Sequence, residues 1–590
     1  MHTHTKIICT IGPVTKSKEM LLKLIDAGMN VARINFSHGN HKEHLITINN
    51  IKEARKEAKK PIAILLDTKG PEIRVGKLIN DCIKLEAKQR IKLIDGEPKN
   101  ESEVPINPYE VTSVLKPSQR ILFDDGYIIG KVLEKTPDGI VVEIENEGLL
   151  KSSKGVNIPN VTLPLPAVTE QDIKDLIFGC EHDVDIVAAS FIRSADHVLE
   201  IKKILADQNK SDIIVISKIE SSEGVDNFDE IAEASDGIMV ARGDLGVEVD
   251  LSLVPKLQKA MIAKCYETSK PVVVATQMLE SMINNPRPTR AEVSDVANAI
   301  YDSASCVMLS AETAAGKYPI ETVLQMKRII HQAEQDFDYK DFFYKETYME
   351  SEDVSSAVAV AAVRTAYSAR AKAIFAITRT GFTTRLLTRL RPEFPIIALT
   401  KTERKYHQLS FLWGIVPLYS ANWSKEREAF AVMSHFAIDN DFISFGDYVV
   451  LISSFPFDKR GITNLMLVES VGDVLIRGFA KGVGKKVKGR IAKIISINGD
   501  SISKAKDKII IISKCDEKYI PLFEVAKGVI LQNRESDTIS EKLALQTASR
   551  LDLPLIIRAR HAADILMEDE EVHLEPQKGL VFKIEENEML

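Results

Sequence analysis

Short apolar runs recur along the first half of the chain, and amphipathic stretches such as Ser17–Ala27 and Asp250–Thr268 separate them. Most of these runs are apolar on both faces, which is typical of fully buried parallel strands. The amphipathic stretches predict helices between them. We therefore expect eight strands, at Lys6–Ile11, Val31–Asn35, Ile62–Asp67, Ile186–Ser190, Ile213–Ser217, Gly237–Val240, Val272–Ala275 and Cys306–Leu309.

This alternation predicts an α/β fold with a (β/α)8 barrel, with an open, doubly wound sheet as the alternative. In such a barrel, catalytic residues lie at the C-terminal ends of the strands. Seven of the expected strands end in polar sequence, for example Arg33–Gly39, Asp67–Arg74, Thr276–Glu280 and Ser310–Thr313. Polar ends that converge on one face of a barrel indicate a binding site there.

Two neighbouring strands end in charged residues. The run Ile213–Ile216 leads to Lys218 and Glu220, and the run Gly237–Val240 leads to Asp244. A buried strand has no structural need for a lysine and a glutamate two residues apart at its end. Two carboxylates and one lysine at adjacent strand ends can hold a divalent cation and a phosphate group together. A structural ion pair at the surface is the simpler alternative.

The segment between the third and fourth expected strands is far longer than one crossover helix needs. It contains alternating apolar positions and turn signals such as Asp124-Asp125-Gly126. Lys151 and Lys154 at its exit would suit a lid over a phosphate site, or are ordinary solvated lysines. We expect an inserted small β domain with strands at Cys82–Leu85, Arg90–Leu93, Ile121–Phe123, Ile128–Val132 and Ile140–Ile144.

The composition, 45% hydrophobic and 27% charged residues over 590 positions, is ordinary for a globular protein. The formal net charge of -7 favours neither nucleic acid nor a membrane surface as a partner. We find no signal peptide and no apolar run near the ~20 residues of a membrane span. The six cysteines are scattered without a CxxC motif, which indicates a reducing cytoplasm and argues against a zinc site or disulfides.

The second half begins with an acidic and aromatic stretch, residues 341–352, which we interpret as a linker. A new α/β pattern follows. It predicts helices and strands at Ser355–Ser368, Ala373–Ile377, Phe382–Leu390, Ile396–Leu399, Gly446–Ser453 and Leu465–Val468.

A loop before the second of these helices is rich in hydroxyl groups. A glycine, an arginine and hydroxyls before a helix N-terminus suit a phosphate-binding nest. A helix merely capped by Thr380 is the alternative, and Arg460–Asn464 is a candidate for a facing loop. The candidate phosphate-binding residues are Thr378, Arg379, Thr380, Gly381 and Thr383.

Several stretches closely resemble the pyruvate kinase family and occur in the family's order. They are KIICTIG (6–12), ARINFSHG (32–39), LDTKGPEIR (66–74), KGVNIP (154–159), ISKIE (216–220), MVARGDLG (239–246), ATQMLESM (275–282) and VMLSAET (307–313). The resemblance continues to about residue 472. It implies transfer of the phosphoryl group of phosphoenolpyruvate to ADP, giving pyruvate and ATP, by a cytoplasmic, allosterically regulated homotetramer. A phosphorylated sugar or a nucleotide would be the effector.

The resemblance also implies catalytic roles. Lys218 would stabilise the transferring phosphoryl group and the enolate oxygen, and Arg33 would clamp the phosphate. Thr276 would contact the substrate and help to deliver a proton to the enolate carbon. Gly243, without a side chain, would let its backbone amide approach the substrate carboxylate. Asp244 would be part of the same substrate site.

Two metal sites follow from the resemblance as well. Glu220 and Asp244 would bind a divalent cation, Mg²⁺ or Mn²⁺, that bridges substrate oxygens. In the family, members with glutamate at the position of Glu72 depend on K⁺, whereas a lysine there replaces the ion's charge. The implied K⁺ ligands are Asn35, Ser37, Asp67 and Thr68.

The implied nucleotide-binding residues are Asn35, His38, Arg74 and Lys154. His38 is otherwise a hydrogen-bonded loop histidine. His41 and His44 follow it at helical spacing, and we interpret them as a solvated helix face rather than as metal ligands. Two positions depart from the family pattern, because Ser303 and Ala311 stand where glycine is usual. Backbone strain at either could perturb the rim of the site.

From Asp473 on, the chain resembles the extra C-terminal domain of some bacterial pyruvate kinases, which is similar to the swivelling phosphohistidine domain of phosphoenolpyruvate-utilising enzymes. The working domain carries a glycine-rich turn and a histidine. Here the corresponding stretch, Asn533–Lys542, has neither, and His561 is out of register. We therefore expect a structural or regulatory domain. The basic run Lys481–Lys493 is interpreted as a solvated face rather than as a polyanion site.

We thus expect a catalytic barrel at 1–70 and 170–340, an inserted β-barrel lid at 71–169, an α/β allosteric domain at 341–472 and a swivelling-type β/β/α domain at 473–590. A non-catalytic scaffold is one alternative, but it would be signalled by loss of Lys218, Glu220, Asp244 or Arg33. A multi-step phosphoenolpyruvate synthase is another, and the missing histidine speaks against it.

Overall fold

The computed structural model describes residues 3–347, 353–456, 461–472 and 474–583. Eight parallel strands close into a barrel in the order β1-β17-β16-β15-β14-β13-β3-β2, so the (β/α)8 prediction is confirmed and the open sheet is excluded. Nearly every strand residue is buried, because helices cover the outer face and side chains fill the interior. The strands are β1 (Lys6–Thr10), β2 (Val31–Asn35), β3 (Ala63–Asp67), β13 (Ile186–Ala189), β14 (Ile214–Ile219), β15 (Gly237–Ala241), β16 (Val272–Ala275) and β17 (Cys306–Leu309).

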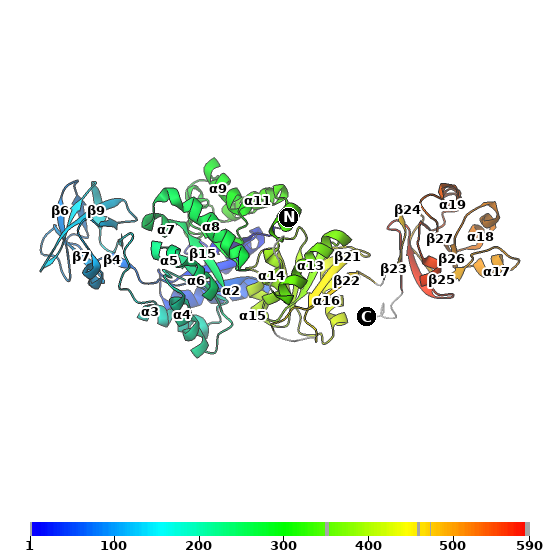
Figure 1. Ribbon diagram of the computed structural model, residues 1–590, viewed down its shortest axis with the longest axis horizontal. Coiled ribbons are helices and arrows are strands. Elements are labelled where there is room, and N and C mark those ends of the chain that lie inside the picture. The colour runs from blue at the N-terminus through cyan, green and yellow to red at the C-terminus, as the bar shows by residue number, and fades with distance from the viewer. Residues whose placement is uncertain (1–2, 348–352, 457–460, 473, 584–590) are drawn as a thin grey trace. The chain divides into compact units, whose positions relative to one another are not determined.

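Polar caps define where the barrel helices begin. Ser17 Oγ accepts a hydrogen bond from the backbone of Met20, and Thr169 and Thr289 form capping boxes with residues three positions on. Figure 1 shows several of these helices around the barrel strand β15. They are α1 (Lys18–Ala27), α2 (His41–Ala58), α3 (Glu170–Glu181), α4 (Ala195–Asp207), α5 (Ser222–Asp226), α6 (Phe228–Ala234), α7 (Arg242–Glu248), α8 (Val254–Glu267), α9 (Arg290–Tyr301), α10 (Ala311–Ala314) and α11 (Pro319–Asp336).

The insertion between β3 and β13 is a second, smaller closed barrel, in the order β10-β6-β7-β4-β12-β8-β9, beside the pair β11-β5. It has its own apolar core, which includes Phe123 and Val142. The predicted β insertion is confirmed. We call it the lid, and its strands are β4 (Ile73–Val75), β5 (Cys82–Leu85), β6 (Arg90–Ile94), β7 (Glu103–Asn107), β8 (Arg120–Phe123), β9 (Ile128–Thr136), β10 (Gly139–Ile144), β11 (Gly148–Lys151) and β12 (Gly155–Asn157).

The predicted linker is partly wrong. Helix α12 (Tyr339–Glu346) occupies its first part, and Phe343 there is fully buried, whereas 348–352 lie outside the described residues. A five-stranded sheet in the order β20-β19-β18-β21-β22 follows. Its elements are α13 (Val354–Ala369), β18 (Ala373–Ile377), α14 (Phe382–Arg389), β19 (Ile396–Thr400), α15 (Glu403–Leu409), β20 (Ile415–Tyr419), α16 (Glu426–Asp439), β21 (Tyr448–Ser453) and β22 (Leu465–Ser470).

The C-terminal part is an eight-stranded mixed sheet in the order β23-β30-β29-β25-β26-β27-β28-β24. One core cluster includes Phe523 and Leu555, and another includes Ile509 and Val572. The elements are β23 (Val474–Arg477), β24 (Phe479–Val483), β25 (Val487–Lys493), α17 (Ser501–Ala505), β26 (Ile509–Ile512), α18 (Ile520–Val525), β27 (Gly528–Leu531), α19 (Thr538–Leu551), β28 (Leu555–Ile557), α20 (Ala562–Ile565), β29 (Glu571–Glu575) and β30 (Leu580–Lys583).

The chain forms two compact units, residues 1–363, 375–429 and 452–465, and residues 364–374, 430–451 and 466–590. The polar strand ends of the barrel, the lid and the hydroxyl-rich loop at 378–383 all belong to the first. Within the described ranges, no helix is long and apolar enough to cross a membrane.

The two departures from the family pattern differ in structure. Ser303 has a φ of +72°, in the left-handed region that favours glycine, whereas Ala311 begins helix α10. A Cβ group at such a φ costs about 1 kcal/mol. The expected strain therefore falls on Ser303, at the approach to β17 and away from the C-terminal end of the strand.

His407 on α15 gives the protein a predicted sensitivity to acid. Only 4% of the residue is exposed, and its Nδ1 accepts a hydrogen bond from the backbone of Ile62 at 3.3 Å. Burial, followed by the charge of Arg55, lowers the pKa of His407 to about 3. The unfolded chain therefore binds a proton below pH ~6.5 that the folded chain does not, and stability falls as the pH drops through this range.

Between pH 7 and pH 5, protonation of His407 in the unfolded chain should lower the free energy of unfolding by about 2 kcal/mol. In His407→Asn the amide oxygen can accept the same hydrogen bond but does not titrate. Denaturant unfolding followed by tryptophan fluorescence at both pH values should show a smaller loss for the variant. Equal losses in the two proteins would contradict the assignment.

Candidate active site

Lys218 lies near the end of β14, where its ammonium group contacts three side chains. Its Nζ atom lies 3.1 Å from Asp67 Oδ1 and 2.9 Å from Glu220 Oε1, and it donates a hydrogen bond to Ser190 Oγ at 2.7 Å. Burial lowers the pKa of Lys218, but the charges of Asp67 and Glu220 outweigh burial and raise it above its ordinary value. The ammonium group is therefore positively charged throughout the physiological pH range.

Arg33 lies on strand β2, and its side chain is held by Asp67, the carboxylate that also contacts Lys218. Its Nε donates to Asp67 Oδ2 at 2.6 Å, and its Nη1 donates to Thr10 Oγ1 at 2.9 Å. Burial would raise the pKa of Asp67, but Arg33 and Lys218 together lower it below its ordinary value. One buried carboxylate thus fixes two cations at the C-terminal end of the barrel. Such a pair of fixed cations suits a phosphate group.

Glu220 and Asp244 lie at the ends of the adjacent strands β14 and β15. Glu220 Oε2 accepts a hydrogen bond from the backbone of Phe191 at 2.6 Å. Burial raises the pKa of both carboxyl groups despite the nearby charge of Lys218, and the two groups are within hydrogen-bonding reach of each other. Two carboxyl groups this close need a proton or a cation between them.

The pair is too small to hold a metal alone. Among the described residues, no group of three or more His, Cys, Asp or Glu side chains could hold an ion. Hard divalent cations take about six oxygen ligands, and Mg²⁺ usually keeps one or two carboxylates together with substrate phosphates and waters. Glu220 and Asp244 therefore fit a cation that is completed by substrate and water oxygens.

Thr276 follows β16 with a φ of +69°, which is rare for a β-branched residue. Its Oγ1 accepts a hydrogen bond from the backbone of Gly243 at 2.8 Å. Arg242 holds this turn, because its Nη2 donates to the Thr276 carbonyl at 2.6 Å and its Nη1 pairs with Asp295 at 2.7 Å. Strained backbone persists only where its surroundings fix it, so Arg242 and Asp295 act as positioning residues for Thr276.

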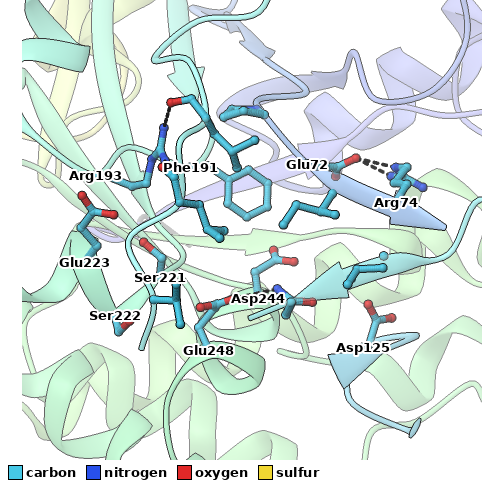
Figure 2. A pocket seen from close by; sticks show the side chains of 18 of the residues that line it. Glu72, Arg74, Asp125, Phe191, Arg193, Ser221, Ser222, Glu223, Asp244 and Glu248 are labelled. Carbon is cyan, nitrogen blue, oxygen red and sulfur yellow. Dashed lines mark hydrogen bonds and ion pairs between the residues drawn. The ribbon is translucent and has the colours of Figure 1, made fainter. Parts of the chain in front are cut away.

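A cavity of about 260 Å³ is lined by the lid, by the loop after β13 and by α7 (Figure 2). Arg74 lines it and donates to Glu72 Oε2 from Nε at 2.7 Å. Lys154 also lines it, with Nζ 2.8 Å from Asp124 Oδ1, and this hydrogen bond raises the pKa of Lys154. Both predicted nucleotide-binding cations thus lie in one cavity with Asp244.

Hydrogen bonds from two side chains tie the lid to the barrel. Asn157 Nδ2 donates to Glu248 Oε1 at 2.8 Å, which joins β12 to α7. Arg193, which is 7% exposed, donates to three carbonyl groups on the chain that leaves the lid, those of Leu163, Leu165 and Pro166. In Figure 2, Arg193 and Glu248 lie on the barrel side of the cavity.

The four predicted K⁺ ligands lie at two adjacent strand ends. Asn35 is opposite Asp67 in the register of β2 and β3, and its Oδ1 accepts a hydrogen bond from the backbone of Ser37 at 3.1 Å. Thr68 Oγ1 accepts one from the backbone of Ser190 at 3.1 Å. These are the hard oxygen atoms that an alkali cation needs.

The histidines near Asn35 differ from the prediction in part. His38 is exposed, but His44 is 7% exposed and its ring stacks on Phe36 with centroids 4.0 Å apart. His41 Nε2 lies 2.6 Å from Asp175 Oδ1. The interpretation of His41 and His44 as a solvated face is therefore wrong for His44, because the helix packs this side chain against an aromatic ring that the sequence pattern did not connect to it.

In the hydroxyl-rich loop before α14, threonine hydroxyl groups accept hydrogen bonds from nearby backbone amides. Thr378 Oγ1 accepts from the Gly381 amide at 2.9 Å, and Thr380 Oγ1 accepts from the Phe382 amide at 3.4 Å. The helix cap is Gly381, with a φ of +85°, so the alternative of Thr380 as N-cap is wrong. Thr383 Oγ1 lies 2.8 Å from Thr463 Oγ1 in the predicted facing loop, of which Arg460 lies outside the described residues.

Comparison with known proteins decides the family. The pyruvate kinase barrel domain matches residues 2–323, and the pyruvate kinase alpha/beta domain matches residues 356–469. The chain belongs to the pyruvate kinase family. Proteins named pyruvate kinase from Bacillus licheniformis (40% identical over 582 residues), Staphylococcus epidermidis (40% over 590) and Sporosarcina psychrophila (39% over 582) each align over 98% of both chains. Like them, this family member is an enzyme of the transferase class.

Several residues of this pyruvate kinase site were not predicted. Ser190 was recognised only as a strand end, yet its hydroxyl contacts Lys218. Arg242 lies directly before Gly243 in a motif of the family, and its charge at a strand end was a usable signal. Asp295 carries no local signal, and Asn157 lies in the motif KGVNIP without any sign of its contact, because their partners lie 53 and 91 residues away.

Proposed function

We propose that this chain transfers the phosphoryl group of phosphoenolpyruvate to a terminal phosphate oxygen of ADP, as the last step of glycolysis. The bond between phosphorus and the enol oxygen breaks, a new P–O bond to ADP forms, and the enolate that is left takes a proton at carbon to give pyruvate. The observation that supports this most is the buried network of Lys218, Asp67 and Arg33 beside the paired carboxylates Glu220 and Asp244.

Each catalytic residue then has a defined task. Lys218 stabilises the charge that grows on the phosphoryl group and the enolate oxygen, and Arg33 holds phosphate oxygens. Both are oriented before substrate binds, because Asp67 fixes them. Thr276 contacts the substrate and assists proton delivery. The Gly243 amide receives the substrate carboxylate in exchange for its hydrogen bond to Thr276.

A divalent cation, Mg²⁺ or Mn²⁺, would be held by Glu220 and Asp244. It would supply Lewis-acid polarisation of substrate oxygens. The two carboxylates keep the positive charge of Lys218 at a fixed distance from that position. The nucleotide is proposed to bind Asn35, His38, Arg74 and Lys154, where the lid cations reach its phosphates.

We further propose a K⁺ site formed by Asn35, Ser37, Asp67 and Thr68. If Glu72 marks K⁺ dependence, omitting K⁺ and Na⁺ from the assay should lower kcat at least about tenfold, equivalent to 1.4 kcal/mol of lost charge stabilisation. Glu72→Lys should remove most of this dependence. Glu72→Gln, which removes the carboxylate charge but adds no positive charge, is the matched control and should keep it. Equal wild-type activity with and without K⁺ would refute the proposal.

The loop Thr378–Thr383 is proposed as the site of a phosphorylated effector, a sugar phosphate or a nucleotide. Arg379 and Thr380 are exposed there, while Thr378 and Thr383 are buried and shape the loop. We also propose a homotetramer, a cytoplasmic location and the four domain ranges given above, which follow from the sequence analysis and the family resemblance. The six unpaired cysteines agree with a reducing compartment.

The C-terminal domain is proposed to be structural or regulatory. In place of a carrier histidine, Asn533–Lys542 contains a closed polar network. Asn533 Oδ1 accepts from the backbone of Arg558 at 2.7 Å, and Glu541 accepts from the Arg558 side chain at 2.9 and 3.0 Å. His561 lies outside this network, with Nδ1 3.3 Å from Asp564 Oδ2. Incubation with labelled phosphoenolpyruvate should therefore leave this domain unlabelled.

A further inference from the structure

Two cations near the base of the barrel have no partner. The side chains of Arg385 on α14 and Lys405 on α15 are half-buried, and within the described part of the chain neither side chain forms a hydrogen bond or an ion pair. Both converge on Gly381. A methyl group in place of its hydrogen would lie 3.7 Å from Arg385 Nη1 and 3.8 Å from Lys405 Cδ. They therefore form one site rather than two separate surface charges.

The nearby carboxylates are already occupied. Asp236 accepts hydrogen bonds from Lys202 Nζ at 3.0 Å and from the backbone of Val215 at 2.9 Å. Asp212 pairs with Arg404 at 3.2 Å. The negative charges of Asp236 and Asp212 still act on Arg385 and Lys405, but they are shared with other partners and do not outweigh the burial of the two cations.

Burial has a measurable consequence for these two side chains. It lowers the pKa of Lys405 to about 8, and the charge of Arg385 lowers it further than burial alone. Burial also lowers the pKa of Arg385. A half-buried cation pair that repels itself is unfavourable unless an anion joins it.

The surrounding contacts place the pair where two parts of the fold meet. Arg389 on α14 donates to the carbonyl of Glu267 at 3.3 Å, and Gln408 on α15 donates to the carbonyls of Asp185 and Asp212 at 2.9 and 2.8 Å. Asp185 and Asp212 precede strands β13 and β14, and Glu267 ends helix α8, which leads to β16. Helices α14 and α15 therefore lie against the base of the barrel, opposite the catalytic end.

We propose that Arg385 and Lys405 bind a phosphate-bearing anion at the barrel base, in a site that borders Gly381 of the effector loop, does not use the exposed side chains of Arg379 and Thr380, and is separate from the catalytic end. A guanidinium fork and an ammonium group together match the oxygens of a phosphate dianion. The anion would neutralise the pair and join α14 and α15 to the barrel. This inference does not depend on the proposed activity.

The first test measures the thermal midpoint of the full-length protein in potassium phosphate and in potassium chloride at equal ionic strength. Arg385→Gln and Lys405→Gln should show a phosphate-dependent rise at least about twofold smaller than wild type, because ligand that binds only the folded state stabilises it. Lys256→Gln, which changes an exposed lysine on α8, should show the same phosphate-dependent rise as wild type. Equal rises in all proteins would overturn the proposal.

The chloride arm separates binding from a structural role. Without phosphate, both glutamine variants should be at least as stable as wild type, because the repulsion between the two cations is gone. A lower midpoint in chloride would assign the residues to packing and would also overturn the proposal. The same measurement with methyl phosphate shows whether the site also accepts phosphate esters or only free phosphate. A rise in thermal midpoint with either ligand supports the site if it is lost in both Arg385→Gln and Lys405→Gln.

A direct test uses crystals of the whole chain soaked in tungstate, a tetrahedral oxyanion with a strong anomalous signal. We expect an anomalous peak between Arg385 and Lys405. Tungstate bound only at the catalytic end, or beside Arg379 and Thr380 without contacting Arg385 and Lys405, would contradict the assignment.

Discussion

Lys218→Met should lower kcat for ATP formation by about 10³-fold or more. Lys218 Nζ lies 2.9 Å from Glu220, and its charge also acts on Asp244. Removing one preorganised group that stabilises transition-state charge typically costs 10²–10³ in rate. Arg33 remains but is directed at Asp67 from the other side. The KM for ADP should change little, because the proposed nucleotide residues belong to the lid, to the end of β2 and to the loop after it.

The control for this variant addresses folding. Loss of Lys218 leaves Asp67 and Glu220 with less counter-charge in a buried place, so its thermal midpoint and circular dichroism must be measured alongside. Lys256→Met, on the exposed face of α8, is the matched substitution and should keep wild-type kcat. A folded Lys218→Met protein with kcat within tenfold of wild type would remove Lys218 from the catalytic role.

Glu220→Gln should raise the Mg²⁺ or Mn²⁺ concentration for half-maximal activity by about 10²-fold. The substitution keeps the size and the hydrogen bond from the Phe191 amide but removes one of the two negative charges at the proposed site. Changes to groups that merely support a metal ligand typically cost 10- to 100-fold in affinity, so loss of a ligand charge should reach at least the upper value.

Glu248→Gln is the matched control for the metal. Glu248 lines the same cavity and its pKa is raised by burial, yet it is held by Asn157 on the lid. It should keep wild-type metal dependence. Mn²⁺ binding followed by electron paramagnetic resonance gives a readout that does not require turnover. Unchanged Mn²⁺ affinity in Glu220→Gln would refute the site.

The sequence predicted the barrel because its signal is local. Each parallel strand is a short two-sided apolar run, and the strand ends are polar at the positions where Lys218, Glu220 and Asp244 lie. The family resemblance added roles for Arg33, Thr276 and Asn35, which no pattern of hydrophobicity could supply. The structure brings Arg33 and Lys218 together through Asp67, a residue that had been assigned only to K⁺.

Long-range contacts could not be predicted in the same way. The Arg242–Asp295 pair, the positive φ of Thr276 and the Asn157–Glu248 contact depend on how distant segments pack. The predictions of a solvated His44 and of a linker at the position of helix α12 were wrong for the same reason, since the apolar partners of these residues are contributed by other elements or turns. Composition alone suggested a linker where Phe343 is in fact buried.

The most direct test follows the phosphorus atom itself. Wild-type protein is mixed with phosphoenolpyruvate, ADP, Mg²⁺ and K⁺, and ³¹P nuclear magnetic resonance records whether the enol phosphate signal is replaced by the γ-phosphate signal of ATP. The account predicts stoichiometric conversion that disappears with Lys218→Met and without divalent cation. Release of inorganic phosphate instead of ATP, no conversion, or equal conversion by Lys218→Met would contradict it.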